Sequence, residues 1–296
     1  MITLLTGSSG FFGSEYIKLW KPDPIITLGR KNSVVKADLS IQVPQIDAVD
    51  LVVHAAGKAH AVPGTDLEKK EFFNVNVTGT KNLLLALENA PLLPRYFVFI
   101  SSVAVYGLET GNLVDEDSPL LAVDPYGKSK IEAEKLVTDW CKKNNVICTI
   151  LRLPLLAGKN PPGNLKSMIN GIKAGYYFNI AGGKAKKSMV MALDVAKIIP
   201  KAAVVGGIYN LTDQHHPSFL ELSSLMAKQL GKKRPLNIPK WVASLLAKTG
   251  DALGSKAPIN SNKLSKIISD LTFDDSKAQH KIGWKPGAVL EQLEIF

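Results

Sequence analysis

The feature that most constrains this chain is a glycine-rich turn that begins at its seventh residue. A short apolar run, Ile2–Thr6, leads into the turn, and an amphipathic stretch, Phe11–Trp20, follows it. Gly7 would permit a tight bend, Gly10 would let the backbone approach a pyrophosphate, and Gly13 would let a helix pack closely on a strand. Because the free N–H groups of a helix N-terminus attract anions, this strand–turn–helix arrangement predicts a dinucleotide-binding loop.

Further short apolar runs follow, separated by stretches with the periodicity of amphipathic helices. The runs are almost wholly apolar, as in strands that are covered on both faces. The expected strands are Ile2–Thr6, Ile25–Leu28, Leu51–Ala55, Tyr96–Ser101 and Ile147–Leu153. The expected helices are Phe11–Trp20, Glu71–Glu88 and Tyr126–Lys142. This order predicts an α/β fold with a doubly wound parallel sheet, a Rossmann-type domain.

The regular alternation lapses after a turn at residues 160–163, which contains Pro-Pro-Gly. Beyond this turn we expect one strand near 208–211 and several helices. The expected helices lie around 165–174, 193–204, 218–230 and 240–253. The sequence thus predicts a dinucleotide-binding domain over residues 1–155, rejoined by about 192–213, and a smaller, mostly α-helical substrate domain over 156–296.

Composition excludes several classes of protein. With 46% hydrophobic residues, the chain of 296 residues can bury a large core. No apolar run approaches the roughly 20 residues of a membrane span. Cys141 and Cys148 are too few for a disulfide framework, and five scattered histidines give no metal-site spacing. We therefore expect a cytoplasmic protein without a membrane span or a bound metal.

The net charge of +10 is unevenly distributed along the chain. Residues 1–155 contain 16 lysines and arginines against 17 acidic residues, whereas residues 156–296 contain 20 against 9. This basic half is either a solvated surface or a region that handles an anionic partner. The lysines are dispersed and lack the interleaved aromatic residues that stack on bases, so we expect no nucleic-acid partner.

The end of the second strand bears on the choice of cofactor. NAD sites have a carboxylate there for the ribose 2′-hydroxyl, whereas this chain has Gly29, Arg30 and Lys31. Cations suit a 2′-phosphate, which makes NADP(H) the preferred cofactor and NAD(H) the alternative. The other interpretation is that Arg30 is a surface residue, or that it stacks on adenine and does not discriminate between the two cofactors. The remaining expected cofactor contacts are Ser9, Phe11, Asp38, Leu39, Ala55, Ala56 and Gly57.

Tyr126 and Lys130 lie four residues apart at the start of an expected helix and therefore share a face, whereas Lys128 points elsewhere. A fixed ammonium favours the phenolate, so we expect Lys130 to lower the pKa of Tyr126 and also to reach the cofactor ribose. Hydride transfer at an alcohol carbon needs such an acid or base. Ser101 and Ser102 end a neighbouring strand, where one hydroxyl would hold the substrate oxygen.

Together these residues resemble the extended short-chain dehydrogenase/reductase family, in its NAD(P)-dependent epimerase/dehydratase branch that acts on nucleotide sugars. The likeness covers nearly the whole chain and rests on Thr6-Gly7-x-x-Gly10-x-x-Gly13, His54-Ala55-Ala56, Asn76-Val77-x-Gly79-Thr80, Ser101-Ser102-x-x-Val105-Tyr106-Gly107, Tyr126-x-x-x-Lys130, Arg152-Leu153-Pro154 and Gly283-Trp284-x-Pro286. The resemblance implies that Ser102 is the hydroxyl donor, that Asn76 supports the active-site lysine, and that the backbone of Leu153 and Pro154 covers the nicotinamide. His54 is interpreted as structural.

The departures from the family pattern narrow the activity. Val103 and Ala104 stand where sugar 4,6-dehydratases of this branch have Asp and Glu, so we do not expect a dehydratase. Residues 56–61 and 152–155 are more similar to 4-keto-sugar reductases of surface-polysaccharide assembly.

The prediction is NADPH-dependent reduction of a 4-keto sugar linked to a nucleoside diphosphate. NAD-dependent 4-epimerisation of a UDP-sugar ranks second, and a non-catalytic protein that senses NADP(H) ranks last. We expect Asn164 and Lys187 to bind the diphosphate, the alternative for Lys187 being a solvent-facing side chain in a basic patch.

Two apolar stretches bear on assembly and on the surface. The two longest expected helices carry stripes that relatives use in part for a four-helix dimer interface, so we expect a homodimer. The residues of these stripes are Leu83, Leu84, Leu87, Leu136 and Val137. Residues 240–246 have the composition of a membrane-surface helix, but the favoured interpretation is a helix that packs on the core. Peripheral membrane contact is the alternative.

Overall fold

The computed structural model describes residues 1–59, 63–252 and 260–295. Its main element is a sheet of seven strands in the order β11-β7-β5-β4-β1-β2-β3, and every neighbouring pair in it is parallel. These strands are β1 Thr3–Thr6, β2 Ile25–Gly29, β3 Val35–Lys36, β4 Leu51–His54, β5 Tyr96–Ser102, β7 Ile147–Leu153 and β11 Gly207–Asn210. The strand order reverses between β1 and β4, which is where doubly wound sheets bind ligands. The predicted fold class is therefore confirmed.

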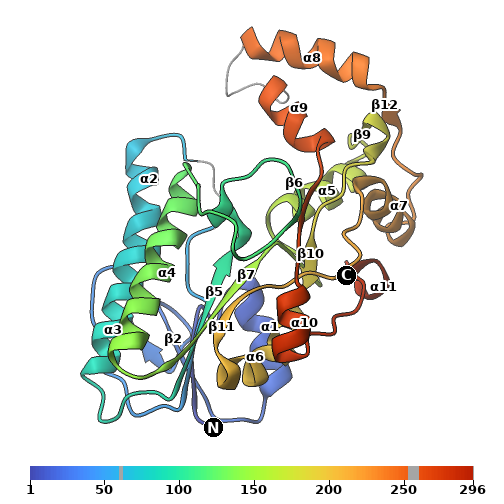
Figure 1. Cartoon of the computed structure of the whole chain (residues 1–296). Coiled ribbons are helices and arrows are strands. Elements are labelled where there is room, and N and C mark those ends of the chain that lie inside the picture. Colours follow the sequence, from blue (N-terminus) through green and yellow to red (C-terminus); the bar gives the residue numbers. More distant parts are fainter. Residues whose placement is uncertain (60–62, 253–259, 296) are drawn as a thin grey trace.

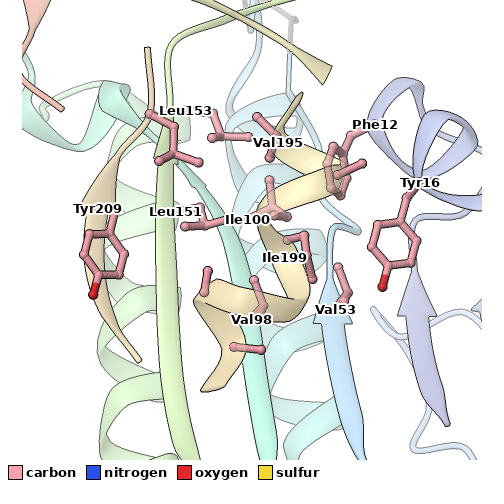
Figure 2. Close-up of a cluster of buried hydrophobic side chains, with 14 of the residues drawn as sticks. Phe12, Tyr16, Val53, Val98, Ile100, Leu151, Leu153, Val195, Ile199 and Tyr209 are labelled. Carbon is pink, nitrogen blue, oxygen red and sulfur yellow. The ribbon is translucent and has the colours of Figure 1, made fainter. Parts of the chain in front are cut away.

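Helices cover both faces of this sheet (Figure 1). The flanking helices are α1 Phe11–Trp20 and α6 Ala192–Val205 on one face, and α3 Gly79–Glu88 and α4 Pro125–Lys143 on the other. Within β5, Val98 packs towards α1 and α6, and its neighbour Phe97 packs towards α3 and α4. Figure 2 shows the first of these clusters, in which Phe12 and Ile199 meet side chains of the strands. Burial on both faces explains why the strands are apolar throughout.

Most of the remaining elements follow residue 156, and several of them pack around an apolar cluster of their own. Three two-stranded sheets join β8 Leu155–Ala157 to β10 Met189–Met191, β9 Asn179–Ile180 to β12 Asn237–Ile238, and β6 Gly111–Val114 to β13 Leu271–Phe273. The other helices are α2 Asp66–Phe73, α5 Gly163–Ala174, α7 Phe219–Gln229, α8 Lys240–Ala252, α9 Ser261–Ile268, α10 Ser276–Ile282 and α11 Val289–Gln292. A π-helical turn η1, Asn74–Thr78, and two 3-10 turns, η2 Val103–Tyr106 and η3 Ala181–Gly183, complete the set. Among the helices described, none has both the length and the apolarity to cross a membrane.

The expected strands and all but one of the expected helices are present, with ends that differ by a few residues. Residue 253, the last of the expected helix 240–253, lies outside the described residues. One expected helix, Glu71–Glu88, is instead α2, η1 and α3 in succession, so a π-helical turn interrupts it. The sequence did not predict the three small sheets or the short helices α9 to α11, because strands of two to four residues are too short to show a period. The division into two domains remains a prediction.

The stripes assigned to a dimer interface mostly serve the core of the subunit itself. Leu83, Leu87 and Val137 are fully buried against the sheet, so they are not available to a second subunit. A shallow groove between α3 and α4 does reach the surface, and its lining includes Leu85 and Leu136. The homodimer therefore remains a prediction, and two of the expected stripe residues, Leu84 and Leu136, line this groove.

The glycine turn fixes how closely α1 approaches β1. Gly7 has a φ of +72°, which favours glycine, and a Cβ at this position would lie 2.7 Å from the carbonyl carbon of Ala55. A Cβ at Gly13 would lie 2.2 Å from the carbonyl oxygen of Gly7. Both clashes involve backbone, which cannot rotate away. The turn, the helix and the segment after β4 are therefore packed as closely as glycine allows.

Replacing Gly13 by alanine tests this close packing. We expect Gly13→Ala to lower the free energy of unfolding by about 1–3 kcal/mol, because the added methyl group meets backbone atoms. Gly79→Ala is the matched control, since a Cβ there would lie 3.6 Å from the Cβ of Leu39, an ordinary contact. Thermal unfolding of both variants measures the difference. Equal melting temperatures would show that α1 is not held in this way.

Candidate active site

The glycine turn forms a cradle at the amino end of α1. Gly10 is the N-cap of α1, and no side chain of the described residues caps that end of the helix, so its first N–H groups are free for a ligand. Ser9 and Gly10 are exposed at the surface of the turn. Phe11 lies beside Gly158, where a Cβ would be 3.1 Å from the ring. These features fit the phosphates of a dinucleotide.

The segment after β2 lies beside the cradle. Ser33 approaches Ser8 of the glycine turn, with 3.4 Å between the two hydroxyl oxygens. Arg30 is exposed at the end of β2 and lies near Asp38. Hydrogen bonds from Ser40 hold the pKa of Asp38 below its usual value, and the charge of Arg30 adds to this effect. Ser33, which the sequence did not single out, thus brings the segment after β2 up to the glycine turn.

The side chain of Leu39 lies in the core, and its contact with the cofactor stays a prediction. Its side chain is buried in the cluster beneath α3, and its carbonyl oxygen accepts a hydrogen bond of 2.7 Å from Asn82. The side chain of Leu39 therefore supports the core below the site, whereas Asp38 beside it stays partly exposed.

The segment after β4 closes the cradle from the other side. The backbone N–H of Ala56 donates to the Thr6 hydroxyl over 3.0 Å, and Ala55 meets Gly7 at the contact described above. His54 lies between two hydroxyls, with 2.7 Å from Nδ1 to Thr6 and 2.9 Å from Nε2 to Thr80. Burial lowers the pKa of His54 to about 3. A neutral, fully bonded imidazole confirms the structural interpretation of His54.

Ser102, Tyr126 and Lys130 come together at the carboxyl end of β5. Ser102 is the last residue of β5, and its hydroxyl lies close enough to the Tyr126 phenol to lower the pKa of that phenol. Asp124 caps the amino end of α4 and Pro125 occupies its first turn, which places Tyr126 at the start of the helix. The Lys130 ammonium donates to the carbonyl oxygen of Ile100 in β5 over 2.7 Å. The predicted three residues therefore share one site, whereas Lys128 is exposed and outside it.

The expected electrostatic relation between Tyr126 and Lys130 is not what the structure shows. Burial raises the pKa of Tyr126, and the hydrogen bond from Ser102 offsets this only in part. Burial lowers the pKa of Lys130 to about 8, with Glu134 acting in the opposite direction. The Lys130 ammonium is directed to the Ile100 carbonyl, so it does not lower the pKa of the phenol. Tyr126 is therefore protonated at neutral pH, which is the form of a proton donor.

Asn76 links the cofactor side of the site to α4. Its side chain exchanges two hydrogen bonds with the backbone of Lys58, of 2.7 and 3.1 Å, and donates to the Ser129 hydroxyl over 2.9 Å. Asn76 lies in the π-helical turn η1, which widens the helix at this residue. A Cβ at Gly57 would lie 3.1 Å from Asn76 and 3.7 Å from the Lys130 ammonium. Asn76 and Lys130 thus both border Gly57, and the support of Lys130 by Asn76 stays a prediction.

A buried ion pair beneath this site was not predicted. Arg152 in β7 and Glu134 in α4 form three hydrogen bonds of 2.8 to 3.3 Å, and their side chains are 3% and 5% exposed. Ser101 donates to the same carboxylate over 2.5 Å. The sequence did carry a signal, because Glu134 lies one helical turn after Lys130 on the same face of α4.

The same network extends to the elements beside β7. Arg152 donates to the Tyr106 hydroxyl over 3.1 Å, and that hydroxyl donates to the side chain of Asn210 over 2.8 Å. The backbone N–H of Asn210 donates in turn to the carboxylate of Glu116 over 2.7 Å. Burial chiefly raises the pKa of Glu116. The network therefore ties η2, β7 and β11 together under the candidate site.

The residues predicted for the substrate side lie on several elements. Leu153 pairs with Ser102 in the register of β7 and β5, so it and Pro154 lie beside the candidate catalytic hydroxyl. Asn164 is exposed in the first turn of α5. Lys187 is half-buried before β10, and burial lowers its pKa while Asp270 acts against this. The described residues contain no cluster that would hold a metal ion.

Removing the charge of Glu134 tests the buried network. We expect Glu134→Gln to lower the free energy of unfolding by about 3–5 kcal/mol, because it leaves Arg152 buried without a counter-charge. The control is Glu109→Gln, which removes one partner of an ion pair that is 55% exposed on both sides, with an effect within about 0.5 kcal/mol. Urea unfolding compares the two variants. Similar losses for both would show that the buried pair has no special role.

Comparisons with known proteins agree with this geometry. The profile of the NAD dependent epimerase/dehydratase family matches residues 3–211. An N-acetyl-α-D-glucosaminyl-diphospho-ditrans,octacis-undecaprenol 4-epimerase of Escherichia coli O157:H7 is 28% identical, over 98% of this chain and 92% of that protein. A UDP-glucose 4-epimerase of Vibrio cholerae is 29% identical over the same shares.

A solved structure extends the likeness to the whole fold. The human epimerase family protein crystallised with NADPH has a TM-score of 0.76 at 18% identity, over 99% of both chains. At this identity the match concerns the fold alone. The family match covers most of the chain and therefore shows the family to which the chain belongs. The chain belongs to the NAD-dependent epimerase/dehydratase family, and it is therefore an NAD(P)-dependent enzyme of the short-chain dehydrogenase/reductase type, as the sequence predicted.

Proposed function

We propose that the chain reduces a 4-keto sugar, carried on a diphosphate, with NADPH as the reductant. The observation that carries this proposal is the placement of Ser102, Tyr126 and Lys130 together at the carboxyl end of β5. Reduction of a ketone requires a proton donor at the carbonyl oxygen, and a phenol with a raised pKa stays protonated at neutral pH. The cations after β2 support NADPH as the cofactor, because Arg30 stands where NAD sites have a carboxylate.

Each residue of the site has a defined part in this reaction. When bound, the nicotinamide supplies the hydride, and the glycine cradle with Arg30 and Ser33 would hold the cofactor. Tyr126 gives its proton to the keto oxygen as that oxygen gains charge, and the Ser102 hydroxyl stabilises the same oxygen. Lys130 is held at the carbonyl oxygen of Ile100, from where its ammonium would reach the cofactor ribose. Asn76 positions α4 through Ser129.

The diphosphate is assigned to the basic second half of the chain. Lys187 is half-buried and so loses less to solvent when it meets an anion, and Asn164 offers an amide at the start of α5. The relatives support this class of substrate, since one is named for a sugar on a polyprenyl diphosphate and another for UDP-glucose. We place the enzyme in surface-polysaccharide assembly, in the cytoplasm, as a homodimer.

A second candidate function is 4-epimerisation of such a sugar. The observation that favours it is the likeness to two 4-epimerases over 98% of this chain. Epimerisation would require Tyr126 to act first as a base and then as an acid, with the cofactor left unchanged overall. The cations that stand in place of a carboxylate after β2 favour NADPH as the cofactor and therefore favour reduction instead.

Replacing Tyr126 tests the proton donor. We expect Tyr126→Phe to lower the turnover rate by at least about 10²-fold, because the substrate oxygen loses its acid. Binding of NADPH, measured by fluorescence titration, should stay unchanged. Tyr176→Phe is the control, since this tyrosine is 66% exposed and lies outside the site. Near-normal turnover by Tyr126→Phe would contradict the proposed role.

Removing the charge of Arg30 tests the choice of cofactor. We expect the intact protein to bind NADPH more tightly than NADH, and Arg30→Ala to narrow this difference by weakening the contact with the 2′-phosphate. The affinity for NADH is the internal control, because NADH lacks that phosphate and should bind equally well to both proteins. Equal affinities of the intact protein for the two cofactors would count against the reductase.

The diphosphate site has its own test. We expect UDP to bind on its own and to compete with the substrate, and Lys187→Ala to weaken UDP binding while sparing NADPH. Added salt should weaken the exposed part of this contact. Lys184→Ala, an exposed lysine in the same segment, is the matched control. Calorimetry with UDP, dTDP and GDP measures the effect, and if none of them binds, the substrate carries no nucleoside diphosphate.

A further inference from the structure

Helix α8 carries an apolar stripe that the described part of the chain leaves exposed. One face of the helix is buried, with Ala243 and Ala247 packed on Leu264 of α9. The opposite face carries Trp241, which is 72% exposed, and Leu245, which is 60% exposed, one helical turn apart. Leu246 next to them is 47% exposed. The favoured prediction for this segment, a helix that packs its apolar stripe on the core, is therefore correct only for the alanine face.

The surroundings of this stripe are strongly basic. Residues 228–251 contain six lysines and arginines and a single acidic residue. That residue, Asp251, is occupied by two hydrogen bonds to Ser261. The exposed cations are Lys228, Lys232, Lys233, Arg234, Lys240 and Lys248. An exposed apolar stripe that is bordered by charged residues is typical of a surface that binds a partner.

We propose that α8 and the basic segment before it dock the enzyme on an anionic lipid surface. Tryptophan and leucine side chains enter the boundary between headgroups and acyl chains, and lysines and arginines bind the anionic headgroups. An anionic lipid surface therefore offers a partner both to the apolar stripe and to the cations. A second copy of this chain fits less well, because pairing the two stripes would bring like charges together at an interface.

The position of α8 in the fold relates docking to the candidate active site. α8 and α9 lie at the end of the molecule towards which the strands of the main sheet point (Figure 1). The candidate active site lies at those carboxyl ends, at Ser102. Docking through α8 would therefore bring the site end of the enzyme towards the membrane, within reach of a sugar diphosphate carried on a lipid. This last consequence rests on the proposed function, whereas docking itself does not.

Vesicle sedimentation tests the proposal with the full-length protein. The probe is phosphatidylcholine vesicles with and without about 30% phosphatidylglycerol, since anionic lipid is the stated partner. We expect the protein to pellet with the anionic vesicles only, and less so with added salt. Trp241→Ser with Leu245→Ser should lower binding at least about tenfold, because the apolar contact is lost. Lys232→Ala and Lys233→Ala should each lower it about fivefold.

The matched control is Leu92→Ser with Leu93→Ser. These leucines are also exposed, at 69% and 41%, but they precede β5 and so lie at the opposite end of the sheet. Their substitution should leave vesicle binding unchanged. Equal binding by the α8 variant and the intact protein, or no binding to anionic vesicles at all, would overturn the proposal. So would a dimer in light scattering that the α8 substitutions dissociate, since a second copy would then cover the stripe.

Failure of docking is distinguishable from failure of the proposed function. The α8 residues lie outside the candidate active site, so turnover of a water-soluble nucleotide-linked keto sugar, measured without vesicles, should be the same for the α8 variant and the intact protein. Loss of vesicle binding with this turnover intact supports docking as a separate property. Loss of turnover in the α8 variant would assign Trp241 and Leu245 to the substrate site and contradict a docking role.

Discussion

The buried ion pair between Arg152 and Glu134 is the interaction on which the candidate site depends most. It joins β7 to α4, and α4 carries Tyr126 and Lys130 two turns and one turn before Glu134. Through Ser101 the same carboxylate holds the end of β5, next to Ser102. A buried charge that loses its partner is costly, so these elements have one favourable arrangement. The pair thus fixes the distance between the hydroxyl on the strand and the phenol on the helix.

Close backbone contact has the corresponding role on the cofactor side. Gly7, Gly13 and Ala55 bring the turn after β1, the helix α1 and the segment after β4 together without intervening side chains. His54 reinforces the contact as a neutral imidazole between Thr6 and Thr80. Asn76 then joins this side to α4 through Ser129. These contacts therefore join the cradle and the proton donor into one continuous site.

Much of this arrangement could be predicted from the sequence. The glycine spacing, the apolar strands and the pair Tyr126 and Lys130 predicted the fold and the members of the site, because each rests on a short local pattern. What depends on contacts between distant residues was not predicted: the ion pair of Glu134 with Arg152, the core position of Leu39, and the direction of the Lys130 ammonium. The raised pKa of Tyr126 belongs to the same class, because it follows from burial by residues far away in the chain.

In the proposed reaction, Tyr126 protonates a keto oxygen while a hydride is transferred irreversibly to the sugar. The most direct measurement uses NADPH deuterated at the transferred position of the nicotinamide, with a nucleotide-linked 4-keto sugar. Mass spectrometry of the product and the absorbance of the cofactor are then followed together. We expect one deuterium at the sugar C4 for each NADPH oxidised. A product without deuterium, or a sugar inverted at C4 with the cofactor unchanged, would contradict it.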